Sequence, residues 1–315
     1  MFFQVLWQVL ISSDLWQAAL QFGALLLLPA IGGVISERSG VVNIAMEGMM
    51  LIGAYAGVMT TVATNNVWIG VIGAIIAGGL MALLHAIVSI NFKANQIVSG
   101  MAINIGGLGL TNFLLTVQTQ GNGIQALSQA NRLPGLQWAP LSNIPFIGPV
   151  LFQQNIIFYV ALVVLIALQF LLFRTNIGLR VRAVGEHPLA ADTAGVNVRL
   201  VRYVCVVGSG LLSGLAGAFL SLGVVGSFNE NMTSGTGYIA LAAMIFGKYS
   251  PVGAAIACLI FGLGEALSPR LQSTGLSTNL LSALPYVLTL VALVGLVGRT
   301  TPPAADGVPY ESASE

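Results

Sequence analysis

Long apolar runs separated by short polar breaks make up most of the chain. The hydrocarbon core of a bilayer is about 30 Å thick, and a helix spans it with about 20 apolar residues. Runs of this length occur at 17–36, 44–64, 67–90, 95–117, 151–173, 203–225, 251–268 and 281–298. The pattern predicts an all-α integral membrane protein, in which residues 1–300 form a polytopic bundle of about eight or nine transmembrane helices.

One further apolar run, residues 237–248, is too short to cross a bilayer comfortably. The residues Tyr249-Ser250-Pro251 separate it from the run that follows. Non-helical backbone at membrane depth is tolerated only where protein or a water-filled cavity satisfies its hydrogen bonds. We therefore expect either a re-entrant or half helix, or a pairing of this run with 251–268 through the break. The break itself either indicates a transport pathway or is a plain loop.

Glycines inside the apolar runs predict close helix packing. Gly53 and Gly57 form one small-xxx-small pair, and Gly210 and Gly214 form another. Such pairs let helix backbones approach each other in lipid, where apolar side chains alone give little drive for association. The chain is therefore expected to form a compact bundle rather than a few anchoring helices.

The main polar segment is residues 174–202. It contains the arginines Arg174, Arg180, Arg182, Arg199 and Arg202. Loops with an excess of Lys and Arg lie on the cytoplasmic side of a membrane. With this segment inside, alternation of the spans also places inside Arg38, Lys93, Lys248 and Arg299, and leaves outside only Arg132 and Arg270. We therefore expect a multi-pass protein of the plasma (inner) membrane, embedded in lipid, with a cytoplasmic C-terminus.

Two other segments differ in composition from the apolar runs. Residues 118–150 are rich in Gln, Asn, Gly and Pro. In this arrangement they form an external loop, which is either simply solvated or a docking surface for an extracytoplasmic partner. Residues 301–315 contain Pro302-Pro303 and end in polar residues, which predicts a disordered cytoplasmic tail.

Composition narrows the classes of function. Of the 315 residues, 56% are hydrophobic and 7% are charged, whereas soluble domains carry about 25% charged residues. The net charge of +1 gives no basic face for nucleic acid. Cys205 and Cys258 lie inside apolar runs, and His85 and His187 lack metal-ligand spacing. Neither a disulfide nor a metal site is therefore expected.

No catalytic motif is present in the sequence. Both G-x-S-x-G and H-E-x-x-H are absent, and Gly247-Lys248 lacks the leading glycine of a P-loop, because Ala242 stands in its place. We therefore expect a transport subunit rather than an enzyme, with no cofactor bound by this chain. Energy for active transport would have to come from another subunit.

Polar residues inside the spans are candidates for a translocation pathway. Asn104 and Asn112 lie eight residues apart, and so near one face of a helix. The full candidate set is Asn43, Glu47, Gln96, Ser99, Asn104 and Asn112. Taken singly, the neutral residues are explained by interhelical hydrogen bonds, and Glu47 by a helix N-terminus. Together they suit an uncharged, hydroxyl-bearing solute, while Glu265, near the end of another run, is ambiguous.

Pro188 and Gly195 indicate a short helix within the polar segment. Proline suits the first position of a helix, and glycine suits the position just past its end. We expect this helix, at about residues 188–194, to dock into a groove on a cytoplasmic partner. The alternative is an ordinary basic loop, which explains the arginines but not the helix. The contact residues would be Glu186, His187, Pro188, Ala190, Ala191, Asp192 and Gly195.

Several stretches together resemble one known family. They are ERSGVVNIAMEGMMLIGAYAG (37–57), ANQIVSGMAINIGGLGLTNFL (94–114), GLRVRAVGEHPLAADTAGVNV (178–198) and TPPAADGVPY (301–310). In this order they resemble the permease subunits of nucleoside-type ABC importers, within the wider family that serves simple sugars and branched-chain amino acids. The resemblance covers most of the chain.

The resemblance implies a set of partners. The chain would be one of two permease subunits, often in a heterodimer with a longer permease. A cytoplasmic ABC ATPase would bind ATP and Mg and supply the power. An extracytoplasmic substrate-binding protein would deliver the solute, and the helix at Pro188–Ala194 would be the coupling helix.

Three alternatives to a nucleoside ABC permease remain at the level of sequence. The same class of importer could carry ribose-like sugars or branched-chain amino acids. An ion-coupled secondary transporter would belong to a different class, and the scarcity of charge near the span centres weighs against it. A membrane scaffold without transport activity is opposed only by the polar residues of the fourth run.

Overall fold

The computed structural model describes residues 7–119, 125–126, 132–271, 287 and 300–311. Within these residues, seven helices are long and apolar enough to cross a membrane. The prediction of an all-α polytopic membrane protein is therefore confirmed. The predicted span at 281–298 lies outside the described residues.

The long helices begin and end close to the predicted runs. They are α2 (Ser13–Arg38), α3 (Met46–Thr64), α4 (Val67–Ala86) with its π-helical extension η1 (Ile87–Asn91), α5 (Gln96–Thr119), α7 (Ile156–Arg174), α10 (Val198–Ala218) with its π-helical extension η4 (Phe219–Val225), and α12 (Pro251–Arg270). The predicted run 151–173 is divided, because Asn155 caps α7 and its side chain accepts a hydrogen bond from the Ile157 N–H.

The shorter elements lie at the ends of the bundle or between the long helices. The helices are η3 (Leu141–Asn143), α6 (Ile147–Phe152), α8 (Asn176–Glu186), α9 (Pro188–Thr193) and α11 (Thr236–Phe246). Two short strands, β1 (Gln125–Ala126) and β2 (Ser227–Phe228), pair antiparallel. Through this pair the predicted external loop contacts the chain just after η4.

Helix α10 is packed along α2, α3 and α4 in the interior of the bundle. A Cβ added to Gly53 would lie 2.6 Å from the Cα of Gly214, and one added to Gly78 would lie 2.4 Å from the Gly210 carbonyl oxygen. Only residues without a side chain permit such close approach. The predicted packing role of Gly53, Gly210 and Gly214 is therefore confirmed.

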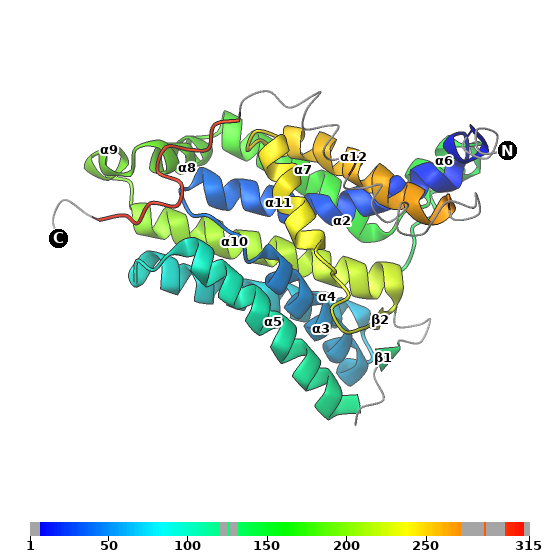
Figure 1. The fold of residues 1–315 in the computed structure, drawn as a ribbon. Helices are drawn as coiled ribbons and strands as arrows, with labels where there is room; N and C mark the ends of the chain where they lie inside the picture. The colour runs from blue at the N-terminus through cyan, green and yellow to red at the C-terminus, as the bar shows by residue number, and fades with distance from the viewer. Residues whose placement is uncertain (1–6, 120–124, 127–131, 272–286, 288–299, 312–315) are drawn as a thin grey trace.

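The basic residues separate between the two ends of the bundle. One end, here called the basic end, is formed by residues 38–45, 91–95, 174–200, 247–250 and 300–311. There the Arg38 Nε donates a hydrogen bond to the Tyr249 carbonyl at 2.8 Å. At the opposite end, which also carries α6 and the β1–β2 pair (Figure 1), the Arg270 Nη2 donates to the Asp14 carbonyl at 2.8 Å.

The C-terminal segment differs from the predicted disordered tail, because residues 300–311 lie folded across the basic end (Figure 1). The Ala305 N–H donates to the Gly185 carbonyl at 2.9 Å. The Arg202 Nη1 donates to the Val308 carbonyl at 2.9 Å. Arg202 is only 1% exposed, and a buried guanidinium needs acceptors. The segment supplies one of them, the Val308 carbonyl, which its polar composition did not reveal.

Helix α11 is a half helix that ends at the basic end, so that with residues 226–235 it forms a broken crossing of the bundle and is not re-entrant. It has 11 residues, far fewer than the roughly 20 that span a bilayer. After η4 the chain turns back into the bundle through residues 226–235, where Thr233 is completely buried. In Figure 1, α11 crosses α2 at a steep angle instead of running along it. Of the two expectations for this region, the structure shows the half helix.

Candidate functional site

Glu47, at the start of α3, holds the turn that leads into α11. Its Oε1 accepts hydrogen bonds from the Thr233 hydroxyl at 2.6 Å and from the Gly235 N–H at 2.8 Å, and its Oε2 accepts one from the Gly237 N–H at 2.6 Å. A carboxylate is favoured at a helix N-terminus, where N–H groups lack partners within the helix. The turn is therefore held in place by one buried side chain.

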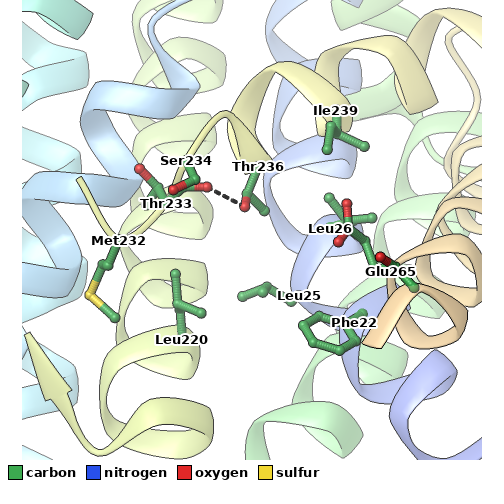
Figure 2. Close-up of a pocket in the computed structure, with 11 residues that line it drawn as sticks. Phe22, Leu25, Leu26, Leu220, Met232, Thr233, Ser234, Thr236, Ile239 and Glu265 are labelled. Atoms are coloured by element: carbon green, nitrogen blue, oxygen red, sulfur yellow. Dashed lines mark hydrogen bonds between the residues drawn. The ribbon is translucent and has the colours of Figure 1, made fainter. Parts of the chain in front are cut away.

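A cavity of about 350 Å³ lies beside this turn, midway along α2. It is lined by Phe22, Leu25, Leu26, Leu220, Met232, Thr233, Ser234, Thr236, Ile239, Glu265 and Ser268. Figure 2 shows Thr233, Ser234 and Thr236 on one side and Glu265 and Phe22 on the other. The cavity therefore has apolar walls with polar groups at two opposite sides.

Three hydroxyl groups of the cavity wall use their own hydrogens within the protein. The Thr233 hydroxyl donates to Glu47 at 2.6 Å, and the Ser234 hydroxyl to the Asn231 carbonyl at 2.9 Å. The Thr236 hydroxyl donates to the Thr233 carbonyl. Each hydroxyl oxygen keeps lone pairs that can accept a hydrogen bond. This side of the cavity therefore offers acceptors rather than donors to a solute.

Glu265 is the acidic residue of the cavity wall. It extends from α12 and is partly buried. None of the residues that the structure describes forms a hydrogen bond or an ion pair with its carboxyl group. Ionisable groups inside membrane spans are normally paired or mark the path of a solute. Glu265, ambiguous in the sequence, therefore lies in the cavity wall with acceptors that no described residue uses.

The structure places Asn43, Gln96 and Ser99 around the connection between α2 and α3, near the basic end. The Asn43 Nδ2 donates to the Ser209 hydroxyl at 2.9 Å, and the Gln96 Oε1 accepts from the Val42 N–H at 2.7 Å. The Ser99 hydroxyl lies 2.9 Å from the His85 Nδ1. These side chains therefore join α4, α5 and α10 to that connection.

Asn104 and Asn112 both have protein partners on other segments. The Asn104 Oδ1 accepts from the Gly48 N–H at 2.8 Å, and its Nδ2 donates to the Tyr238 hydroxyl at 2.9 Å. The Asn112 Nδ2 donates to Glu230 at 2.7 Å. None of the six candidate pathway residues lines the described cavity; Glu47 contacts its wall through Thr233. Their role in transport stays a prediction.

The residues that line the cavity were missed by sequence reasoning, apart from Glu265. They come from α2, η4, α12 and the turn before α11, which are far apart in the chain. A usable signal was present in Met232-Thr233-Ser234-Gly235-Thr236, a run of small polar residues just before an apolar run too short to span. Interrupted apolar segments of this kind often mark a binding site in transporters.

A second surface lies at the basic end, on α8 and α9. The predicted helix from Pro188 is present as α9, and Gly195 follows it with φ +82°. A groove of about 370 Å³ separates α9 from α8. It is lined by Leu179, Arg180, Ala183, Glu186, His187, Ala190, Ala191, Ala194 and Val196. Glu186 ends α8, and its carboxylate accepts a hydrogen bond from the Ala304 N–H at 3.2 Å.

Comparison with known proteins identifies the family. The model of the family described as branched-chain amino acid transport system, permease component, matches residues 17–293. The guanosine ABC transporter permease protein of Bacillus subtilis is 41% identical over 96% of this chain and 98% of its own. The nucleoside ABC transporter permease protein of Lactococcus lactis is 39% identical over 90% and 92%.

A third relative is named for a sugar. The putative glucose ABC transporter permease protein of Haloferax volcanii is 35% identical over 92% of this chain and 93% of its own. No solved structure matches the chain at a significant level. Together with the membrane-spanning helices, these similarities show that the chain belongs to the family of branched-chain amino acid transport system permease components, which includes these ABC transporter permeases.

Proposed function

We propose that this chain is a membrane-spanning permease subunit of an ATP-driven ABC importer that carries nucleosides. The observation that carries this proposal is the cavity midway along α2. Its volume of about 350 Å³ falls within the range of small-molecule sites, about 300–1,000 Å³. Apolar walls suit a flat base, and the polar groups at two sides suit a hydroxylated sugar. The two relatives named for guanosine and nucleosides support the same cargo.

The other cargo classes fit the cavity less well. A free amino acid carries a carboxylate, which needs a basic group or a helix N-terminus. The described lining contains neither Lys nor Arg, and Glu47 already occupies the N-terminus of α11. A sugar would satisfy the polar groups but would leave the apolar walls without a partner.

The ATPase would bind at the basic end, through α9. Leu189 on α9 is 55% exposed, as an apolar contact for a partner would be. The contact set would include Glu186, His187, Pro188, Ala190, Ala191, Asp192 and Gly195, with ATP and Mg held by the partner. By the positive-inside rule, this end and the C-terminus would lie in the cytoplasm.

Movement of α9 would reach the cavity through α8. The His187 N–H donates to the Ala183 carbonyl at 2.9 Å, which joins the two short helices. Gly185 packs so closely on Arg38 that an added Cβ would lie 2.2 Å from the Arg38 carbonyl oxygen. Helix α8 also contacts α10. Both α2 and η4, the extension of α10, line the cavity. A shift of α9, passed on through α8 to these helices, would therefore change the balance between outward-open and inward-open states of the bundle.

The remaining partners would lie beside and outside the bundle. A second permease subunit would complete the translocation path, in a heterodimer or a homodimer. An extracytoplasmic substrate-binding protein would dock at the end that carries α6 and the β1–β2 pair.

Uptake measurements test the cargo. Cells that express the complete importer should accumulate labelled nucleosides, and should stop when ATP is depleted while ion gradients are maintained. Sugars and branched-chain amino acids, offered in the same panel, should not accumulate. Preferential uptake of either class would show the cargo to be wrong, and uptake without ATP would contradict the ABC mechanism.

Co-purification tests the docking surface. Leu189→Asp places a charge on α9, and should reduce both recovery of the ATPase and uptake. Val308→Asp is the matched control, because Val308 is 51% exposed at the same end but lies in the C-terminal segment. If Leu189→Asp retained both ATPase binding and uptake, α9 would not be the docking helix.

A further inference from the structure

Glu265 has no protein partner among the described residues, although it lies in a helix long enough to span a membrane. The other buried carboxylate of this region, Glu47, accepts hydrogen bonds from Thr233, Gly235 and Gly237. The two acidic groups therefore differ: Glu47 is used by the fold, whereas no described residue uses the acceptor capacity of Glu265. A solute in the cavity can use it.

The opposite wall of the cavity limits what that solute can be. The hydroxyl groups of Thr233, Ser234 and Thr236 donate their hydrogen bonds to protein atoms, so only their oxygen lone pairs are available to a solute. With Glu265 on the far side, both polar sides of the cavity present acceptors (Figure 2), and Ser268 of α12 adds one hydroxyl that can donate or accept. A well-matched solute is therefore rich in hydrogen-bond donors, and has an apolar middle that fits against Leu25 and Leu220.

We infer that Glu265 is the specificity-determining residue of this cavity, and that its two carboxyl oxygens accept hydrogen bonds from two adjacent donors of a nucleoside. This inference rests on the proposed function. A carboxylate receives paired donors in a two-pronged geometry, and such charge-assisted bonds are stronger than neutral ones. A site built in this way rejects analogues that lack the donors, because its acceptor is then left without a partner.

Two parts of a nucleoside carry such a donor pair. One is the 2′,3′-diol of the ribose, and the other is the N1–H and 2-amino edge of a guanine base. The shared chemistry is a pair of neighbouring donors. Comparing guanosine with 2′,3′-dideoxyguanosine removes the first pair alone, and comparing guanosine with inosine breaks the second pair by removing its 2-amino group alone.

The experiment measures initial uptake rates of these three compounds by the complete importer, at solute concentrations far below saturation, where the rates report kcat/KM. The wild type should transport guanosine faster than one of the two analogues, by on the order of 10-fold or more. In Glu265→Gln this ratio should fall towards parity. Glu265→Asp keeps a carboxyl group and should keep part of the preference. Because the ratio is formed within one variant, the amount of folded importer cancels.

Glu230→Gln is the matched control, since Glu230 is exposed and accepts a hydrogen bond from Asn112 outside the cavity; its ratio should equal that of the wild type. An unchanged ratio in Glu265→Gln, or a wild type that transports all three compounds alike, would overturn the inference while leaving nucleoside import intact. A wild type that imports no nucleoside would overturn the proposed function as well. If Glu265→Gln abolished transport altogether, the inference would be tested by the wild type and Glu265→Asp. A preference for guanosine in the wild type that is weaker in Glu265→Asp would support it, and equal ratios in the two proteins would contradict it.

Discussion

The carboxylate of Glu47 accepts a hydrogen bond of 2.6 Å from the hydroxyl of Thr233, 186 residues further along the chain. This bond joins the first turn of α3 to the turn before α11, and Thr233 is also part of the cavity wall. One side of the cavity is therefore positioned by a residue that does not itself line it.

Replacing Glu47 should loosen this turn. Glu47→Ala leaves the buried donors of Thr233, Gly235 and Gly237 without their acceptor, and each such loss costs about 1–3 kcal/mol. We expect a lower thermal midpoint Tm of the purified complex and a large loss of uptake. Glu230→Gln, which changes an exposed acceptor, should have little effect on either. An unchanged Tm in Glu47→Ala would show that the turn is held by other contacts.

Gly214 should tolerate no side chain. A Cβ at this position would lie 2.3 Å from the Ala74 carbonyl oxygen, so Gly214→Ala would force α10 away from α4 and cost about 1–3 kcal/mol. Gly208 lies on the same helix, and among the described residues no atom comes within 4 Å of a Cβ added there. Gly208→Ala should leave Tm unchanged or raise it. Equal effects of the two substitutions would contradict the close approach of these helices.

Asn104 separates a structural role from a transport role. Asn104→Ala removes the acceptor of the buried Gly48 N–H and the donor to Tyr238. We expect a stability loss of about 1–3 kcal/mol, with relative uptake rates of different nucleosides unchanged. Asn112→Ala loses one exposed bond to Glu230 and should affect Tm far less. A change in solute preference without loss of stability would instead place Asn104 in the pathway.

Docking of the C-terminal segment should depend on pH through Asp306. Burial raises the pKa of Asp306 to about 7, and the opposing effects of a hydrogen bond with Glu37 and of the Arg202 charge are smaller. The pKa of the Asp306 carboxyl is higher when the C-terminal segment is docked than when it is released. The protonated carboxyl therefore favours the docked segment. Docking is therefore strongest below the ordinary Asp pKa of about 4, and weakens as the pH rises towards 7.

Hydrogen exchange of the peptide spanning residues 303–310 measures this effect between pH 5 and pH 8. Relative to Asp306→Asn at each pH, the wild-type peptide should lose protection as the pH rises. The asparagine cannot ionise, so the variant provides the reference without this titration. Parallel behaviour of the two proteins across the range would exclude Asp306 as the titrating group.

The sequence by itself determined the class of the protein and much of its local structure. Span positions follow from the lengths of apolar runs, because a bilayer requires about 20 such residues in a helix. Pro188 and Gly195 correctly marked α9, since their backbone preferences act within a few residues. The short apolar run at 237–248 correctly predicted a helix too short to span the membrane, which the structure shows as α11.

Only the tertiary structure decided which polar groups meet. Asn104 and Gln96 have the polarity expected of a pathway lining, yet their side-chain oxygens accept hydrogen bonds from the backbone N–H groups of Gly48 and Val42, on other segments. The segment 300–311 is polar and proline-containing, yet it folds because Arg202, far away in the chain, is buried beneath it.

The cavity itself depends on how four separated segments pack. Phe22, Leu220, Thr233 and Glu265 come together only when α2, η4, the turn before α11 and α12 are assembled. Hydropathy and helix signals are local properties of the chain, whereas a cavity is the space that packed helices leave between them. The sequence could therefore predict the half helix, whereas the side chains that line the cavity followed from the packing.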